Sequence, residues 1–271
     1  MCLREETMSE KVNFRKKIRK YCEFILTKIK VLFEQKYFNY HDTILKYMLK
    51  KSKSDKLVIV FSSCTRKGLR ARYNYVRTLK NVDCNQLFIL DDFAEDHRGG
   101  YYIGSNFRFN DEKATVALIK KIQAELGIKE TIYCGSSKGG WAALNIGLQF
   151  EKATIIIGGP QYFLADYLLK SGNIDTLNYI IGEKNEQKLT KLNTYLREKI
   201  ENNKYIDSQK IYVHYSNKEH TYKEHIKDLL EDLYRMQYNI TENVGDYTCH
   251  SDISYHFPDF LINTLSESFK I

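Results

Sequence analysis

Proline, paired cysteines and long apolar runs are scarce or missing in this chain of 271 residues. It has only two prolines, a bias that fits an AT-rich coding background and says nothing about function. The six cysteines are scattered without a CxxC pair or metal-ligand spacing, which predicts reduced thiols in a cytoplasmic protein and no metal site. No apolar run approaches the roughly 18 to 20 residues of a membrane span. The apolar-rich segment 24–33 is interrupted by Lys28 and Lys30, so neither a spanning helix nor a signal peptide is predicted.

Glycine-rich phosphate loops are also missing. Neither a G-x-G-x-x-G nor a Walker A pattern occurs, so nucleoside-triphosphate chemistry has no support. The net charge of +8 lies entirely in residues 1–56, which hold 15 Lys/Arg and 7 Asp/Glu, while the remainder holds 27 of each. Because no nucleic-acid-binding motif accompanies this charge, we predict no nucleic-acid partner.

The first 55 residues form a separate basic segment. Apolar residues recur in it at helical spacing, and lysines and arginines crowd its start, which predicts a basic helical N-terminal extension. Such a helix can rest on an anionic membrane surface or dock to partner enzymes. The alternative is a solvated helix packed on its own domain.

Most of the functional information lies in residues 135–139, which read Gly-Ser-Ser-Lys-Gly. This G-x-S-x-G follows a β-branched and aromatic run at 131–134 and precedes a helix-like stretch at 140–148. Strand, sharp turn and helix are the context of a nucleophile elbow, in which the glycines permit close packing and the middle serine is exposed. The predicted nucleophile is therefore Ser137. The alternative is a glycine-rich turn that merely contains serines.

A serine nucleophile needs a base and an acid that orients it, in the chain order Ser, Asp or Glu, His for an α/β-hydrolase. Glu219 follows a predicted strand at 210–215 and is the expected acid. His250 lies in a loop between a weaker strand at 238–244 and a final helix at 253–269, and it is the expected base. His214 alternates within a strand and is expected to be structural. The rival acids are Asp166 and Asp246, and the rival bases are His220, His225 and His256.

An oxyanion hole also requires backbone N–H donors. Lys138, directly after the nucleophile, supplies the first, and either Ser63 or Cys64, after a strand at 56–61, supplies the second. No H-G-G-G motif is present.

The loop 96–102 adds a candidate substrate-binding pair, Arg98 and Gly99. An arginine beside glycines can hold a phosphate or carboxylate with two hydrogen bonds. The alternative is a structural ion pair between Arg98 and a neighbouring aspartate.

Strands near 56–61, 86–90, 131–135, 154–159, 210–215 and 238–244 alternate with helices near 70–80, 111–126, 140–148, 221–236 and 253–269. This alternation predicts an α/β fold with a mostly parallel sheet and helices on both faces. Residues 56–271 are the predicted catalytic domain, and residues 161–209 interrupt the alternation as a predicted helical cap. No internal repeat or flexible linker separates further domains.

Several motifs in this order resemble bacterial capsular polysaccharide O-acetyltransferases of the α/β-hydrolase fold, with a more distant likeness to acetyltransferase-like proteins of the accessory Sec system. The resemblance covers about residues 56–270 and rests on Tyr73-Asn74-Tyr75-Val76, the loop 96–102, the elbow 135–140, Gly159-Pro160-Gln161 and Leu164-Ala165-Asp166-Tyr167.

The resemblance implies acetyl-CoA as donor, with no bound cofactor, and a hydroxyl of a capsular or surface glycan as acceptor. It places the nucleophile on Ser137, the base on His250 and the acid in the loop 217–220, where this chain carries Glu219 in place of adjacent aspartates. The expected activity is a serine-dependent O-acetyltransferase in the cytoplasm, either free or peripheral at the inner membrane face within a capsule-synthesis complex. The alternatives are a carbohydrate esterase or deacetylase with the same triad, and a noncatalytic capsule-assembly protein.

Overall fold

The computed structural model describes residues 31 and 33–269. The chain divides into two units, residues 1–36 and residues 37–271, and the fold is that of the second unit. The helix predicted for residues 1–30, and its predicted docking role, lie outside the described residues. In the described part of the chain, no helix is long and apolar enough to cross a membrane.

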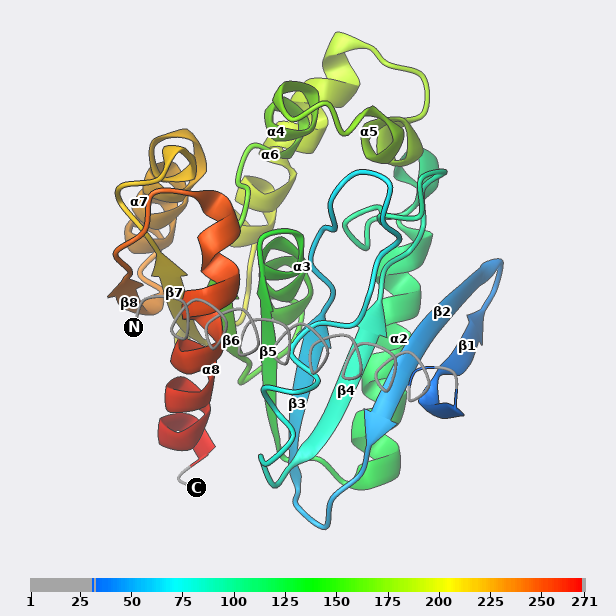
Figure 1. Cartoon of the computed structure of the whole chain (residues 1–271), viewed down its shortest axis with the longest axis vertical. Helices are drawn as coiled ribbons and strands as arrows, with labels where there is room; N and C mark the ends of the chain where they lie inside the picture. The colour runs from blue at the N-terminus through cyan, green and yellow to red at the C-terminus, as the bar shows by residue number, and fades with distance from the viewer. Residues whose placement is uncertain (1–30, 32, 270–271) are drawn as a thin grey trace, which may run out of the picture. The chain divides into compact units, whose positions relative to one another are not determined.

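In residues 33–269, eight strands form one sheet in the order β1-β2-β4-β3-β5-β6-β7-β8 (Figure 1). Strand β2 pairs antiparallel with β4, and every pairing from β4 to β8 is parallel. The strands are β1 (Lys36–Tyr40), β2 (Thr43–Lys50), β3 (Lys56–Phe61), β4 (Asn85–Leu90), β5 (Glu130–Ser136), β6 (Thr154–Gly158), β7 (Lys210–Tyr215) and β8 (Asn239–Val244).

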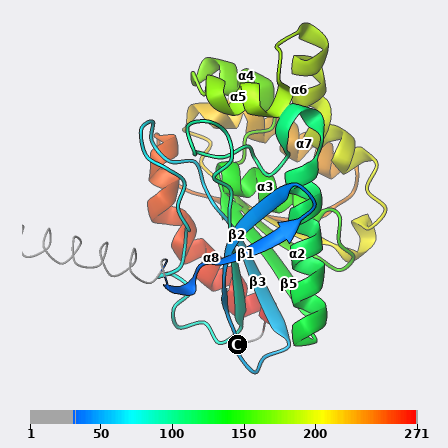
Figure 2. The same cartoon turned by 90° about the vertical axis from the view of Figure 1, so that its right-hand side faces the viewer.

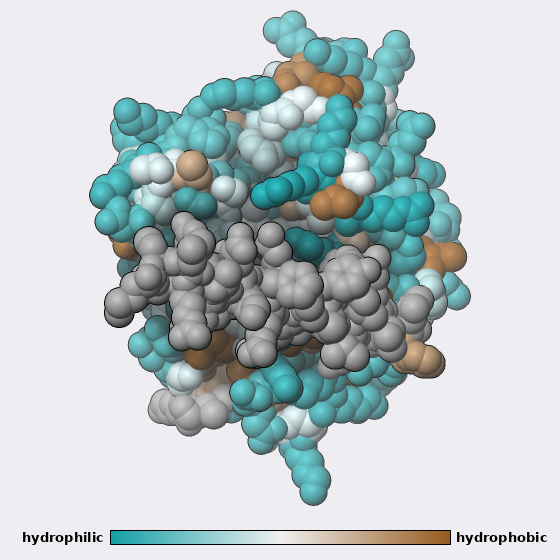
Figure 3. Space-filling model, viewed as in Figure 1, coloured by the Kyte–Doolittle hydropathy of each residue, from teal (hydrophilic) through white to brown (hydrophobic). Residues whose placement is uncertain are grey.

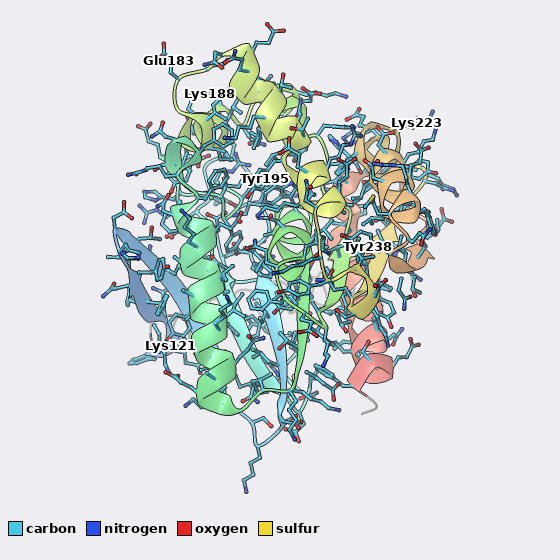
Figure 4. The ribbon with its side chains drawn as sticks, turned by 180° about the vertical axis from the view of Figure 1, so that it is seen from behind. Lys121, Glu183, Lys188, Tyr195, Lys223 and Tyr238 are labelled. Atoms are coloured by element: carbon cyan, nitrogen blue, oxygen red, sulfur yellow. The ribbon has the colours of Figure 1, made fainter. Side chains whose placement is uncertain are left out.

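The central strands are apolar over most of their length because helices cover both faces of the sheet. Residues 57–61 of β3 and 155–157 of β6 are almost completely buried. Helix α8 packs on β5, β6 and β7, whereas α3 packs on β3, β5 and β6. Figure 2 shows α8 on one side of the sheet and α2 and α3 on the other. Figure 4, from behind, shows α2 with Lys121 in front of the sheet. The helices are α2 (Asn110–Leu126), α3 (Lys138–Gly147), α4 (Leu164–Lys170), α5 (Ile174–Ile181), α6 (Glu186–Glu201), α7 (Lys227–Arg235) and α8 (Ile253–Phe269), with short turns η1 (Ser105–Phe107), η2 (Ile206–Ser208), η3 (Tyr222–Ile226) and η4 (His250–Asp252).

Two predictions about the first third of the chain are wrong. Residues 36–50 are not helical: they form β1 and β2, so the sheet begins before the predicted boundary at residue 56. Residues 70–80 form turns instead of a helix. The Asn74 side chain accepts the Ser63 N–H at 2.8 Å, and the Tyr75 hydroxyl bonds the Ser136 hydroxyl at 2.5 Å. These tertiary bonds outweigh the local helix propensity.

Helices α4, α5 and α6 occupy the segment between β6 and β7 that was predicted as a cap. They follow the carboxyl end of β6 and lie at that end of the sheet in Figure 1. Three hydrogen bonds hold helix α5 in place. Within the helix, Thr176 Oγ1 donates to Gly99 O at 3.0 Å and Tyr179 OH donates to Asp111 Oδ2 at 2.7 Å. Just before the helix, Asn173 Oδ1 accepts from Arg98 at 2.5 Å. Behind it, Tyr195 and Lys199 of α6 both bond the buried Glu112 carboxylate (Figure 4).

The buried Asp111 carboxyl makes stability depend on pH. Burial raises its pKa to about 7 from an ordinary value of 3.8, so the folded state binds a proton that the unfolded state releases. The free energy of unfolding therefore falls as pH rises from about 4 to about 7, by at most about 4 kcal/mol from this group. We expect Asp111→Asn to remove this component in urea titrations across that range, because the amide still accepts from Tyr179. The exposed Asp42→Asn is the control, and an unchanged pH slope in Asp111→Asn would refute the assignment.

Candidate active site

Ser137 occupies a strained turn between β5 and α3. Its φ of 53° and ψ of −123° are a backbone conformation that residues other than glycine rarely adopt. The turn is held from both sides, since the Ser137 N–H donates to Gly158 O at 2.7 Å and its carbonyl accepts from Trp141 N at 3.0 Å. Strain of this kind collects at functional sites and persists only where surrounding structure fixes it.

The glycines of the motif permit the close contact between strand and helix. A Cβ on Gly135 would lie 2.4 Å from the Gly139 carbonyl oxygen, and a Cβ on Gly139 would lie 2.5 Å from the Phe61 carbonyl oxygen. Both neighbours are backbone atoms that cannot move aside. Only glycine fits at these two positions, so the spacing of the motif is a packing requirement of the elbow.

The structure brings Ser137, His250 and Glu219 together from three separate loops. Ser137 Oγ lies 3.0 Å from His250 Nε2, and His250 Nδ1 lies 3.1 Å from Glu219 Oε1. These are hydrogen-bond distances, and they place an acceptor nitrogen on the serine hydroxyl and a carboxylate on the opposite nitrogen of the ring. Ser137 and His250 are half-buried, whereas the Glu219 side chain is fully buried.

The acid is fixed by its own neighbours. The Thr221 hydroxyl also donates to Glu219 Oε1, and among the described residues the buried Glu219 Oε2 has no hydrogen-bond partner. A buried carboxylate with one free oxygen gains from a nearby positive charge. It therefore favours the imidazolium that forms when His250 takes a proton.

The rival residues lie elsewhere. Asp166 and Asp246 are exposed and bond Asn193 and Lys218. His220 and His256 are exposed as well.

The other two histidines are buried. Burial lowers the pKa of His225 to about 4, and its Nδ1 accepts from Phe163 N. His214 bonds Asn243 and packs against Phe257 and Phe260, in line with its expected structural role.

Gln161 is a site residue that the sequence analysis did not single out. Its fully buried side chain donates from Nε2 to Ser137 Oγ at 3.0 Å and lies 3.4 Å from His250 Nε2. The Tyr101 hydroxyl donates to Gln161 Oε1 at 3.3 Å, which turns the amide nitrogen toward the serine. Its place just after β6, beside the elbow strand, is a signal that the sequence did contain, because ligands of parallel sheets bind at the carboxyl ends of the strands.

The backbone N–H groups predicted as oxyanion donors differ in their hydrogen bonding. Lys138 is the first residue of α3, where backbone N–H groups have no partner within the helix. The Ser63 N–H is not free for this role, because it donates to Asn74 Oδ1 at 2.8 Å. Of Ser63 and Cys64, the two residues predicted to supply the second oxyanion N–H, Cys64 remains the candidate.

The Lys138 side chain does something that the motif did not predict. It turns away from the elbow surface into the core, where Nζ bonds Asp91 Oδ2 at 3.0 Å, Asp91 O at 3.0 Å and Arg98 O at 2.9 Å. Both charged side chains are fully buried. Asp91 also accepts the N–H groups of Gly100 and Tyr102, so this ion pair fastens the loop 91–102 to the elbow.

Arg98 and Gly99 stabilise the same loop, residues 91–102, through bonds and packing within the protein. The Arg98 guanidinium bonds Thr65 O at 2.6 and 2.9 Å and contacts Cys64 Sγ, while Asp96 lies 3.5 Å away. The alternative reading, a structural ion pair, therefore fits better than substrate binding. Gly99 has a φ of +106°, and a Cβ there would overlap Lys138 Nζ at 2.1 Å, so glycine is needed for packing.

Sheet order, elbow and the Ser–His–Glu arrangement define an α/β-hydrolase-like protein. No protein-family model matches the sequence, and a search of curated proteins gave no match. Among solved structures, the chain is similar to the capsule O-acetyltransferase of Neisseria meningitidis serogroup A, with 24% identity over 85% of this chain and 93% of that chain and a TM-score of 0.74. A mutant of that enzyme in complex with CoA gives a TM-score of 0.73.

Two further structures have the same fold. One is the glycosylation-associated Gap123 complex of Streptococcus agalactiae, with 19% identity over 87% of this chain and 47% of that chain and a TM-score of 0.69. The other is the acylaminoacyl peptidase of Pyrococcus horikoshii, with 11% identity over 86% of this chain and 41% of that chain and a TM-score of 0.63. At these identities the similarities establish the fold, and the predicted α/β-hydrolase-like architecture is confirmed.

Proposed function

We propose that the protein is a serine-dependent O-acetyltransferase that moves acetyl from acetyl-CoA to a hydroxyl of a capsular or surface polysaccharide. The observation that carries the proposal is the Ser137–His250–Glu219 chain of hydrogen bonds. It occurs on a fold shared with a capsule O-acetyltransferase that also has a CoA complex. The same likeness supports acetyl-CoA as donor and a glycan as acceptor.

In the first half-reaction, Ser137 Oγ attacks the thioester carbonyl carbon while His250 Nε2 takes the hydroxyl proton. Glu219 stabilises the resulting imidazolium, and the Lys138 N–H donates to the oxyanion. The carbon–sulfur bond then breaks, and His250 returns the proton to the CoA sulfur. CoA leaves as the thiol, and Ser137 carries the acetyl group as an ester.

In the second half-reaction, a sugar hydroxyl attacks the acetyl-serine carbonyl carbon and His250 takes its proton. The bond between the carbonyl carbon and Ser137 Oγ breaks, and His250 returns the proton to that oxygen. The sugar leaves acetylated and the free serine is restored. Water in place of the sugar would give hydrolysis by the same steps.

The test is acetyl-CoA turnover by the purified protein, with and without a panel of capsular oligosaccharides. Glycan-dependent release of CoA, together with acetylated glycan in the mass spectrum, is the expected result. Hydrolysis of simple acetyl esters with no stimulation by any glycan would replace the proposal with an esterase. That second candidate is favoured by the fold shared with a peptidase, since the triad serves both reactions.

Gln161→Ala should slow acylation of Ser137. The amide is a side-chain donor to the nucleophilic oxygen, so its loss frees that hydroxyl to turn away from His250. We expect the rate with p-nitrophenyl acetate to fall about tenfold or more, the effect of one hydrogen bond at a reacting atom. Gln149→Ala is the matched control, because Gln149 follows the end of α3 opposite to Ser137 and its amide bonds Glu112 of α2. A wild-type rate for Gln161→Ala would contradict this role.

We further propose a cytoplasmic site of action, in keeping with the free thiols of the four cysteines in the described residues and with a CoA thioester donor. For the basic N-terminal extension, predicted over residues 1–55, we propose a contact to a membrane surface or to a capsule-synthesis complex, made by the part that precedes β1.

A further inference from the structure

Residues 62–82 carry an unusual concentration of positive charge. This stretch holds six Lys/Arg and no Asp/Glu, whereas the other residues of 57–271 hold 21 basic and 27 acidic side chains. Residues 57–271 are neutral as a whole, so the positive charge of this segment is balanced by an excess of acidic side chains in the rest of the domain. That segment follows β3 directly and therefore begins at the carboxyl end of the sheet, where Ser137 lies.

Four of these cations are exposed and unpaired. We name residues 66–72 the cationic loop; its charged members are Arg66, Lys67, Arg70 and Arg72, all exposed. Within the described part of the chain, none of the four forms a salt bridge or a side-chain hydrogen bond. Arginines elsewhere in the domain, such as Arg98, Arg197 and Arg235, have carboxylate partners. A cluster of free cations that repel each other is costly to the folded state, and an anionic ligand offsets that repulsion.

The cationic loop is anchored on both sides to the nucleophile's surroundings. At its start, the Ser63 hydroxyl donates to the Ser136 carbonyl at 2.9 Å, and Arg66 follows three residues later, at most about 10 Å along the chain. At its end, Ala71 N donates to His97 O at 2.8 Å, and the Asn74 side chain holds the Ser63 N–H.

The loop itself is closed by a short bridge. The Thr65 hydroxyl donates to Leu69 O at 2.5 Å, and Leu69 N donates to Arg66 O at 3.0 Å. Its base is therefore fixed while its charged side chains reach solvent. In Figures 1 and 2 the strand ends that carry this loop and Ser137 point toward α4 and α5. In the view of Figure 3, most of the coloured surface is hydrophilic, with scattered hydrophobic residues.

We propose that the cationic loop binds the phosphate groups of the acyl-CoA donor. The inference rests on the proposed function, which places the thioester carbonyl at Ser137. In a CoA thioester, a flexible arm separates the phosphates from the thioester group. A cation cluster that lies near the nucleophile, but outside the reaction site itself, is therefore placed where these phosphates can bind. Guanidinium groups hold phosphates with paired, charge-assisted hydrogen bonds. Arg98, the sequence candidate for this role, is already bonded within the protein, whereas the loop cations are free.

The test measures CoA binding directly, by isothermal titration calorimetry, in wild type and in a variant with all four loop cations changed to glutamine. Loss of several charge-assisted hydrogen bonds should raise the Kd for CoA about tenfold or more, and should flatten its rise with added NaCl. The control changes four exposed lysines elsewhere in the domain whose side chains have no ion-pair or hydrogen-bond partner among the described residues: Lys113→Gln, Lys120→Gln, Lys152→Gln and Lys184→Gln. A Kd for the loop variant within twofold of wild type would overturn the inference.

Kinetic measurements show whether the cationic loop binds phosphate of the acyl-CoA donor or of the glycan acceptor. We expect kcat/KM for acetyl-CoA to fall about tenfold in the loop variant relative to kcat/KM for S-acetyl-N-acetylcysteamine, a thioester without phosphate. If instead only the KM for a phosphate-bearing glycan rises, the loop serves the acceptor and the donor assignment is wrong. CoA binding through the loop without any glycan acetylation would leave the inference standing and refute the proposed function. Glycan acetylation that is unchanged in the loop variant would refute the inference and leave the proposed function standing.

Discussion

Ser137→Ala is expected to lower turnover of acetyl-CoA by about 10⁴-fold or more, the usual effect of removing a catalytic nucleophile. The hydroxyl oxygen is the atom that lies 3.0 Å from His250 and 3.0 Å from Gln161, and alanine provides no substitute. Alanine keeps the Cβ, so the strained φ of 53° is unchanged. The thermal midpoint should therefore stay close to that of wild type.

Ser136→Ala is the control, because the motif contains two adjacent serines. The Ser136 hydroxyl bonds Tyr75 and Ser63 and has no role in the proposed steps. We expect this variant to keep its rate within a few fold and to lose about 1 kcal/mol of stability from the broken hydrogen bond. More than a tenth of wild-type activity in Ser137→Ala would refute the acetyl-serine mechanism.

Lys138→Met should reduce the free energy of unfolding by about 3 to 5 kcal/mol, the range observed when one partner of a buried ion pair is removed. The methionine fills most of the lysine volume. It leaves the buried Asp91 carboxylate without its cation and the carbonyls of Asp91 and Arg98 without their donor. Urea denaturation gives the value.

The exposed pair Lys121–Glu125 provides the comparison, since Lys121→Met should cost less than about 0.5 kcal/mol. Adding Asp91→Asn to Lys138→Met should recover part of the loss, because the amide no longer needs a counter-charge and its oxygen still accepts from Gly100. Equal effects of Lys138→Met and Lys121→Met would show that the buried pair does not hold the loop.

The parts of the site that depend on local sequence pattern could be predicted. A G-x-S-x-G between a strand and a helix has one geometry, because residues 135 and 139 must pack backbone on backbone. The positions of Glu219 and His250 follow from the chain order, because each comes after a strand of a parallel sheet and such strands share one carboxyl edge. Strand assignments for residues 56–61 and 154–158 were confirmed for a similar reason: continuous β-branched runs are typical of strands covered on both faces.

The rest depended on contacts between distant residues. The position of Gln161 after β6 places it at the carboxyl edge of the sheet, but no local pattern indicates that its amide meets Ser137, 24 positions away. Arg98 looked available for a ligand, yet its partners Thr65 and Asn173 lie 33 and 75 positions away. In β2 only Thr43, Leu45 and Met48 are buried, and the lysines of the same strand, Lys46 and Lys50, favoured the view that the segment belonged to the basic helix.

The separation of Ser137 and His250 by 113 positions has a consequence for synthesis of the protein. A nascent chain that has passed the elbow already contains the proposed nucleophile, but the proposed base follows only 113 positions later. Under the proposed mechanism, chains that stop before residue 250 hold the serine without its base, and they should not consume the acetyl donor. The proposed activity should begin only when β7 and β8 have joined the sheet and α8 has packed on it, so turnover in a translation mixture would report complete folding of the domain.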